Sequence, residues 1–314
     1  MGGAPAGAPA AASAKMNGMR IVIGGSSGFL GTALVRQLRA DGHEVVRLVR
    51  RDTEAPDEVT WRPSVEPLDP AVLEGTDVAV NLAGAGVAEH RWNEAYRALI
   101  RASRVNSSQA LAEAVAGAQA PPAVLVNASA VGYYGDTGDK EVDESSPAGE
   151  GYFPEVCQAW EAASAPAEEA GIRVVHLRTG LVLAADGGLL RPMLRLFRWG
   201  LGGRLGNGRQ WMPWISLADW VSAVGFLLGS GVTGPVNLTA PAPVRNRDFT
   251  RTLGRVLHRP AVLPVPGFVL RLVLGEFGGE ALSGQRVLPT VLAGAGYRFE
   301  HPDLESALRW SVAR

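Results

Sequence analysis

Three glycines near the amino terminus have the spacing of a loop that holds phosphate groups. Gly25, Gly28 and Gly31 stand in the segment GGSSGFLG at residues 24–31. Glycine allows a tight turn, close approach of the backbone to a pyrophosphate and close packing of a helix on a strand, and the helix N-terminus offers unpaired N–H groups. The segment predicts a dinucleotide-binding loop, with a purely structural turn as the alternative. The predicted contacts are Gly25, Ser26, Ser27, Gly28, Phe29, Leu30 and Gly31.

Two arginines at the end of the next predicted strand indicate which dinucleotide binds. A site selective for NAD usually has an acidic residue there, about twenty residues beyond the glycines, to hold the ribose 2′-hydroxyl. This strand ends in Arg50 and Arg51 instead. Because guanidinium groups suit a phosphate, the pattern predicts NADP as the cofactor. The alternative is a pair of solvated arginines, with Asp52 as a partner for either one.

A run of arginines in the second half of the chain indicates binding of an anion. Residues 178–209 contain one acid, Asp186, and six arginines: Arg178, Arg191, Arg195, Arg198, Arg204 and Arg209. Arg191, Arg195 and Arg198 fall on one face of a predicted helix, where they could hold a phosphate or carboxylate of a small-molecule substrate. A solvated helix face, or a surface for another subunit in a homo-oligomer, is the alternative.

The elements that must position these residues alternate between short apolar runs and helical patterns. Strands are predicted at 20–24, 44–49, 59–61, 78–82, 124–128, 173–177 and 235–238, and helices at 28–40, 92–117 and 152–170. This alternation predicts an α/β fold with a doubly wound, Rossmann-type, mainly parallel sheet and a small C-terminal lobe. Its ligand crevice is expected beyond the carboxyl ends of the strands.

Shifts in composition predict three parts. Residues 1–18 are rich in Ala, Gly, Pro and Ser, lack the apolar run of a signal peptide, and are expected to form a disordered tail. Residues 19–240 are expected to form the NADP-binding domain, with a substrate-side insertion at about 186–215. After residue 240 the pattern changes to short elements punctuated by Pro and Gly, which predicts the lobe at 241–314.

Composition excludes several other classes of protein. A formal net charge of −1 lacks the basic excess of nucleic-acid binders and of polybasic membrane-surface proteins. The single cysteine, Cys157, and five scattered histidines offer neither a disulfide nor metal-ligand spacing. We therefore expect a cytoplasmic protein without a metal, a nucleic-acid partner or a membrane span.

Eight motifs in the same order resemble those of one known family. They are GGSSGFLG at 24–31, VNLAGAGV at 80–87, RWNEAYRALIRASRV at 91–105, SAVGYYGD at 129–136, VCQAWEAA at 156–163, RTGLVL at 178–183, GNGRQWMPWISLAD at 206–219 and GQRVLPTVLAGAGYRFEHPDLESAL from 284. They resemble an atypical short-chain dehydrogenase/reductase group, the epimerase-family or cell-division-inhibitor-like nucleotide-sugar epimerase group. The resemblance covers everything after residue 18.

The resemblance also implies further NADP contacts. They are Leu82, Ala83 and Gly84 after the fourth strand, Arg104 on the following helix and Val182 after the sixth strand. Each contact has a plainer alternative. Leu82 and Val182 would be core residues in any sheet protein, and Arg104 could be a surface charge.

The catalytic pair of the family is missing from this chain. Relatives with established hydride chemistry use a serine with a YxxxK pair, in which the lysine lowers the pKa of the tyrosine. By resemblance Ser129 takes the place of the serine, while Phe153 and Cys157 occupy the tyrosine and lysine positions. Tyr152 is one residue early, and the chain's two lysines, at 15 and 140, lie off that helix.

Other side chains could replace the missing pair. Tyr133 and Tyr134 follow Ser129 and could present a phenol to the cleft, although aromatic residues in loops more often pack as pocket walls. Cys157 has Glu155 and Glu161 as helical neighbours, and because acids raise a thiol pKa, we expect it to be inert.

The segment at 206–214 supplies candidates for the substrate pocket, because the matching stretch borders that pocket in extended relatives. Arg209, Gln210 and Trp211 are the predicted lining residues, and Trp214 is expected in the core. Two functions follow. The first is an NADP-dependent oxidoreductase or epimerase acting on a small hydroxyl or carbonyl compound, for which the arginines would suit an anionic form. The second is an NADP-binding sensor or regulatory protein that kept the crevice and lost the chemistry.

Overall fold

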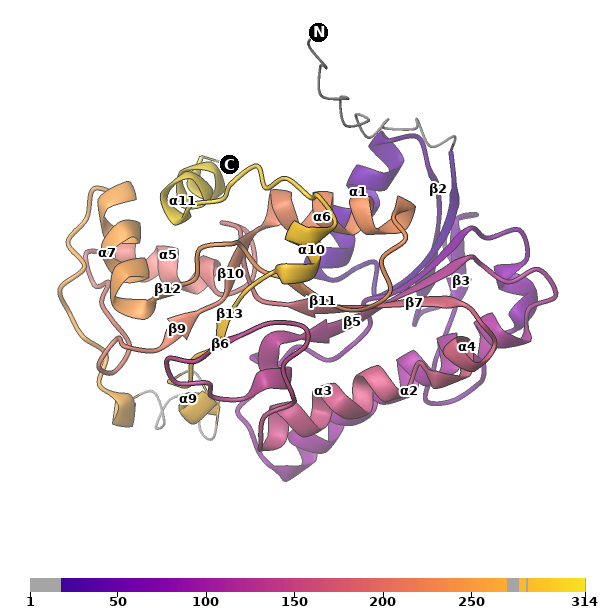
Figure 1. The fold of residues 1–314 in the computed structure, drawn as a ribbon, viewed down its shortest axis with the longest axis horizontal. Coiled ribbons are helices and arrows are strands. Elements are labelled where there is room, and N and C mark those ends of the chain that lie inside the picture. The colour runs from indigo at the N-terminus through magenta and orange to yellow at the C-terminus, as the bar shows by residue number, and fades with distance from the viewer. Residues whose placement is uncertain (1–17, 270–276, 281, 314) are drawn as a thin grey trace, which may run out of the picture.

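The computed structural model describes residues 18–269, 277–280 and 282–313, and its centre is a seven-stranded parallel sheet (Figure 1). The strands are β1 (Arg20–Gly24), β2 (Glu44–Val49), β3 (Glu58–Thr60), β4 (Val78–Asn81), β5 (Val124–Ala130), β7 (Arg173–Thr179) and β11 (Gly234–Leu238). Their spatial order is β11-β7-β5-β4-β1-β2-β3. The chain therefore has the predicted doubly wound, Rossmann-type fold, and the winding reverses between β1 and β4.

Helices cover both faces of the sheet, which explains why its strands read as continuous apolar runs. On one face lie α1 (Phe29–Ala40), α6 (Leu217–Gly229) and α10 (Thr290–Gly294), as Figure 1 shows. On the other lie α2 (Glu94–Gly117), α3 (Tyr152–Ala162) and α4 (Ala165–Glu169). Ile21, Val22 and Ile23 of β1 point alternately into the two resulting cores and are fully buried.

A lobe packs against one end of the sheet and has its own core. It contains α5 (Leu190–Arg198), α7 (Asn246–Val256) and α11 (Leu304–Val312), together with the short ladders of β8 (Leu181–Leu183) with β10 (Trp214–Ser216) and β9 (Trp211–Met212) with β12 (Val244–Arg245). Leu194, Trp214, Phe249 and Leu308 share this core. The substrate-side segment and the C-terminal segment thus build the lobe together.

The remaining short elements lie around the loops of the sheet. They are β6 (Glu141–Val142), which pairs with β13 (Arg286–Val287), the 3-10 turns η1 (Pro70–Leu73) and η2 (Val131–Tyr134), and α9 (Phe277–Glu280). In the described part of the chain, no helix combines the length and apolar character that a bilayer crossing needs. Within the same residues no cluster of three or more potential metal ligands occurs.

Several predicted elements differ from the structure in their bounds, and two of these differences affect the site. The helix expected at 152–170 is divided into α3 and α4, because Pro166 in the first turn of α4 has no N–H to continue α3. The strand expected at 124–128 continues to Ala130, so Ser129 is a strand residue. The expected tail at 1–18 lies, apart from Gly18, outside the described residues.

Candidate cofactor and substrate site

The loop after β1 is glycine-rich because backbone segments cross there at close range. Gly25 has φ +77°, and a Cβ on it would lie 2.4 Å from the carbonyl carbon of Leu82. A Cβ on Gly31 would lie 2.2 Å from the carbonyl oxygen of Gly25. Both positions therefore require glycine for the fold itself. The crossing places the loop where the winding reverses, which is where doubly wound sheets bind their ligands.

Gly28 differs because the fold does not require it. Its φ is −73°, and an added Cβ would meet only the carbonyl oxygen of Gly25, at an ordinary 3.4 Å. It stands at the N-terminus of α1, where no described side chain caps the helix and the first turn carries no acid. The helix thus presents N–H groups and its positive end beside a residue without a side chain. These features fit the phosphates of a dinucleotide.

The arginines after β2 lie in different environments. Arg51 donates two hydrogen bonds to the carboxylate of Glu58, at 2.7 and 2.9 Å, and these bonds raise its pKa. The guanidinium of Arg50 is exposed and makes no hydrogen bond or ion pair with any residue that the structure describes. Arg62, which sequence reasoning missed, pairs with Asp52 at 2.9 Å. Arg50 is therefore the cation free to meet a phosphate.

The loop after β4 and the helix that follows it bring Arg104 beside the crevice. A Cβ on Gly84 would lie 3.3 Å from the Cγ of Arg104. The Arg104 guanidinium donates to the carbonyl oxygens of Ala85 and Ile100, and burial lowers its pKa. No described acid forms an ion pair with it. Arg104 is therefore a partly buried cation with no counter-charge, and not a surface charge.

The other residues that the resemblance implied have mixed positions. Leu82 packs against the main core, and Ala83 N–H donates to the side chain of Asn81. Val182 is a buried core residue of β8 and pairs with Ile215 of β10. The side chains of Leu82 and Val182 therefore belong to the core, as the plainer alternative for each of them stated.

A buried polar network takes up the region where catalytic groups were expected. Ser129 is 3% exposed, and its hydroxyl donates to Glu161 at 2.6 Å. Arg178 donates to both Glu161 oxygens, at 2.8 and 2.9 Å, and to the hydroxyl of Tyr134 at 3.0 Å. Tyr134 in turn donates to Asn237 at 2.8 Å. The network joins β5, α3, β7, η2 and β11.

The members of this network are buried and bonded to one another, and this leaves them little scope for acid–base chemistry. Burial raises the pKa of Tyr134 to about 12. Burial lowers the pKa of Arg178, but the hydrogen bonds and charge of Glu161 raise it overall. The geometry gives no support to Ser129 or Tyr134 as groups that act on a substrate, because each is buried and already bonded. The guanidinium of Arg178 also lies over the ring of Tyr133, 3.4 Å from its centroid.

The positions of the missing pair are filled by packing side chains. Cys157 is buried, and burial and Glu161 raise its pKa to about 12, both of which favour the packed, inert thiol that was expected. Phe153 packs on Trp92, with ring centroids 5.3 Å apart. Tyr152 turns toward α2, where its hydroxyl donates to the carbonyl of Arg97 at 2.6 Å. No described lysine lies on α3.

The predicted substrate residues border a cavity of about 260 Å³. It is lined by Asp136, Gly138, Asp139, Asn207, Arg209, Gln210, Arg245, Leu282 and Gly284. Trp211 lies beside this cavity, and its indole donates to Asp139 at 2.9 Å, which lowers the pKa of that acid. Arg245 and Arg286 lie over the Trp211 ring, 4.6 and 4.7 Å from its centroid. Trp214 is fully buried, as predicted.

Comparison with known proteins adds a family to this geometry. A sequence profile described as "NAD dependent epimerase/dehydratase family" matches residues 21–238. The chain belongs to that family. A second profile, described as "Domain of unknown function (DUF1731)", matches residues 265–311.

Members of the epimerase family align with nearly all of this chain. Epimerase family protein Mb2239 of Mycobacterium bovis is 46% identical over 94% of this chain and 98% of its own length. Epimerase family protein SDR39U1 of Bos taurus is 40% identical over 94% of this chain and all of its own. A crystal structure of human epimerase family protein SDR39U1 (isoform2) with NADPH has a TM-score of 0.87 at 36% identity, covering 94% and 99% of the two chains.

Several site residues of this epimerase family chain escaped sequence reasoning. Asp139, Arg245 and Arg286 surround Trp211 although they are far apart in the chain. They meet because β12 pairs with β9 and β13 pairs with β6, in ladders of two residues each. Ladders this short leave no periodic signal in a sequence. Glu161 was considered only as a neighbour of Cys157, although its partners lie on β5 and β7.

Proposed function

We propose that this protein binds NADP(H) and acts as an oxidoreductase or epimerase on a small anionic compound that carries a hydroxyl or carbonyl group. The observation that carries the proposal is the unpartnered guanidinium of Arg50, beside a glycine loop whose Gly28 leaves room at the start of α1. The human relative crystallised with NADPH supports the choice of cofactor. Bound NADP(H) would supply or accept a hydride.

Different residues of the chain would bind different parts of the cofactor and the substrate. The N-terminus of α1 and the loop from Gly25 to Gly31 would hold the pyrophosphate, and Arg50 the 2′-phosphate. Arg104 has no counter-charge among the described residues. It would face the pyrophosphate of the cofactor or an anionic group of the substrate. Arg209 and Gln210 would hold the substrate in the cavity of about 260 Å³, beside the indole of Trp211.

Tyr133 is the proton donor that we retain. Among the three catalytic candidates, only its hydroxyl makes no hydrogen bond with a residue that the structure describes. The guanidinium of Arg178 lies over its ring, and this cation–π contact helps to hold the ring in place. Tyr133 thus keeps a hydroxyl that no described residue occupies, and this hydroxyl could contact a substrate.

The test combines a ligand search with matched variants. NADPH-loaded protein is screened against a metabolite collection for binding and for oxidation of NADPH at 340 nm. Arg209→Ala should weaken the binding of a hit by about 1–3 kcal/mol while NADPH affinity and thermal stability stay intact. Trp211→Ala should weaken it similarly with NADPH affinity intact, although it also removes the contacts with Asp139, Arg245 and Arg286. Tyr133→Phe should lower turnover by about 10²–10⁴-fold with hit binding unchanged. Turnover that Tyr133→Phe leaves intact would refute its role.

A second function, an NADP-binding sensor, is favoured by a separate observation. Phe153 and Cys157 fill the positions of the Tyr–Lys pair, and the hydroxyl of Ser129 is bonded within the protein. In that case a metabolite would bind beside the cofactor, and NADPH would not be consumed. Hits that bind without turnover, in wild type and Tyr133→Phe alike, would establish the sensor and overturn the enzyme.

A further inference from the structure

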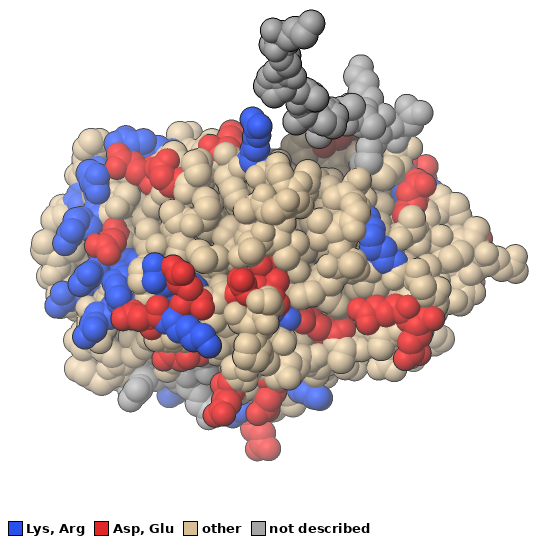
Figure 2. Space-filling view, in the orientation of Figure 1, with Lys and Arg blue, Asp and Glu red and all other residues tan. Residues whose placement is uncertain are grey.

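Charge is distributed very unevenly along this nearly neutral chain. Residues 186–269 contain ten arginines and three acids, whereas the rest of the sequence contains twenty basic and twenty-eight acidic residues. One of the three acids, Asp219, is buried and accepts hydrogen bonds from the N–H groups of Glu300 and His301. Figure 2 shows the basic side chains gathered at the end of the molecule where Figure 1 places α5 and α7.

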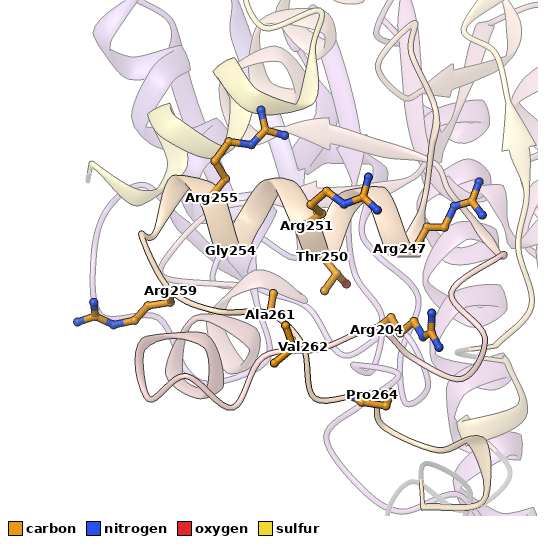
Figure 3. A pocket seen from close by; sticks show the side chains of 10 residues that line it. All are labelled: Arg204, Arg247, Thr250, Arg251, Gly254, Arg255, Arg259, Ala261, Val262 and Pro264. Carbon is orange, nitrogen blue, oxygen red and sulfur yellow. The ribbon is translucent and has the colours of Figure 1, made fainter.

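A cavity of about 450 Å³ lies within this basic region, between α7 and the segment that follows it. It is lined by Arg204, Arg247, Thr250, Arg251, Gly254, Arg255, Arg259, Ala261, Val262 and Pro264. Five of the ten lining residues are arginines and none is an acid. Figure 3 shows the side chains of Arg247, Arg251 and Arg255 extending above α7 and that of Arg259 pointing away from them. The volume is within the range of small-molecule sites.

Three of these arginines have little or no compensation from the described residues. Arg255 is paired with Glu305 at 2.9 Å, and Arg259 donates to backbone carbonyls. Arg247 and Arg251 reach only Asp248, at the long distances of 3.6 and 3.9 Å. Arg204 makes no ion pair or hydrogen bond through its side chain with any residue that the structure describes.

Two of the under-compensated arginines also start from neighbouring positions, beside Gly208. A Cβ on Gly208, which has φ +69°, would lie 3.0 Å from the Cβ of Arg247 and 3.2 Å from the Cβ of Arg204. The backbone fixes this proximity, because the N–H of Arg247 donates to the carbonyl of Gly208 at 3.0 Å. Adjacent like charges destabilise a fold unless an anion lies between them.

Thr250 gives an independent indication of a ligand. It is 2% exposed, and its hydroxyl has no hydrogen-bond partner among the described residues. Figure 3 shows it directed below α7, into the same space as Ala261, Val262 and Arg204. A buried hydroxyl without a partner costs free energy, and native structures rarely leave one. A phosphate oxygen in the cavity would satisfy it.

We propose that this cavity is a second anion site, which takes a compact compound with two or more phosphate groups, such as a pyrophosphate or a nucleoside diphosphate. A single monoanion would leave most of the charge of Arg204, Arg247 and Arg251 uncompensated. The site is separate from the cavity of about 260 Å³, which is lined by Arg209 and Arg245 and shares no lining residue with it. It does not depend on the proposed enzymatic function.

The test is isothermal titration calorimetry with inorganic pyrophosphate. The protein is saturated with NADPH, so that the glycine loop and Arg50 do not bind the probe. Wild type should bind one pyrophosphate, and orthophosphate should bind at least about tenfold more weakly. Arg204→Ala/Arg251→Ala should weaken pyrophosphate binding at least about tenfold, and Thr250→Val by about threefold or more.

The matched control is Arg191→Ala/Arg195→Ala, which removes the same number of charges from the same lobe but from α5, outside the cavity. It should change pyrophosphate affinity by no more than about threefold. Equal losses in both double variants would reduce the effect to general electrostatics and overturn the site. So would the absence of binding to wild type, or a loss of pyrophosphate binding in Arg50→Ala. A parallel titration with ADP separates a nucleotide site from one for free pyrophosphate. Should Thr250→Val unfold, the exposed arginine pair decides alone.

Discussion

In the proposed cofactor site, the two arginines after β2 contribute unequally to binding of the NADPH 2′-phosphate. Arg50 has no partner among the described residues, whereas Arg51 is bonded twice to Glu58. Arg51 must give up these bonds to reach a phosphate, but Arg50 need only turn toward it. We therefore expect the preference for NADPH over NADH to depend mainly on Arg50.

The size of the effect follows from the kind of bond that is lost. A charge-assisted hydrogen bond contributes about 1.5–3 kcal/mol, so Arg50→Ala should weaken NADPH binding by about 13- to 160-fold. NADH lacks the 2′-phosphate and should bind the variant as it binds wild type. Arg51→Ala should cost less NADPH affinity than Arg50→Ala. It should also lower thermal stability, because Glu58 keeps only its contacts with Arg47 and the Glu54 N–H.

Titration of both cofactors against wild type, Arg50→Ala and Arg51→Ala measures these differences, with cofactor fluorescence as the signal. Arg36→Ala, on the exposed part of α1, is the control for a simple loss of charge. Equal weakening of NADPH and NADH in Arg50→Ala would refute the assignment of the 2′-phosphate. A larger loss in Arg51→Ala than in Arg50→Ala would show that the pair with Glu58 opens on binding.

Three further predictions concern the buried network. Glu161→Gln leaves Arg178 buried without a counter-charge and should destabilise the fold by about 3–5 kcal/mol in urea unfolding, with NADPH affinity of the folded protein unchanged. Tyr134→Phe should cost about 1–3 kcal/mol of stability and leave any pH–rate profile unaltered, because a phenol with a pKa near 12 stays protonated; a lost limb of that profile would contradict the placement. Cys157 should resist iodoacetamide at pH 8 in the folded protein and react on unfolding, and labelling of native protein would show that the thiol is neither buried nor raised in pKa.

The fold could be predicted because its signals are local. Strands covered on both faces read as apolar runs, and the helices between them begin after glycine or polar residues. The glycine loop and the arginines after β2 are each contiguous in the chain, so position alone placed them at the carboxyl edge of the sheet. The division of the helix predicted at 152–170 was missed because a proline in a first turn, here Pro166, is easily read as continuation of a helix.

The interior of the site could not be predicted, because it depends on which way side chains point. Ser129 was expected beyond the end of a strand, where a hydroxyl can face the crevice. β5 instead continues to Ala130, and a period of two then sets Ser129 on the same face as Asn127. Asn127 donates to the carbonyl of Trp160, and Ser129 to Glu161, so both point toward α3. Because β5 includes Ser129 and Ala130, the Ser129 hydroxyl lies under α3 and does not face the crevice.

The same geometry explains how the family fold can persist without the Tyr–Lys pair. A lysine at position 157 would place a third cation near Arg104 and Arg178, which already influence that thiol. Arg178 instead supplies the cation from β7, and Glu161 neutralises it on α3. The positive charge is thus retained but points at the ring of Tyr133 and the hydroxyl of Tyr134. Chemistry in this crevice must therefore use a phenol positioned by η2, not one positioned by α3, or use no protein phenol at all.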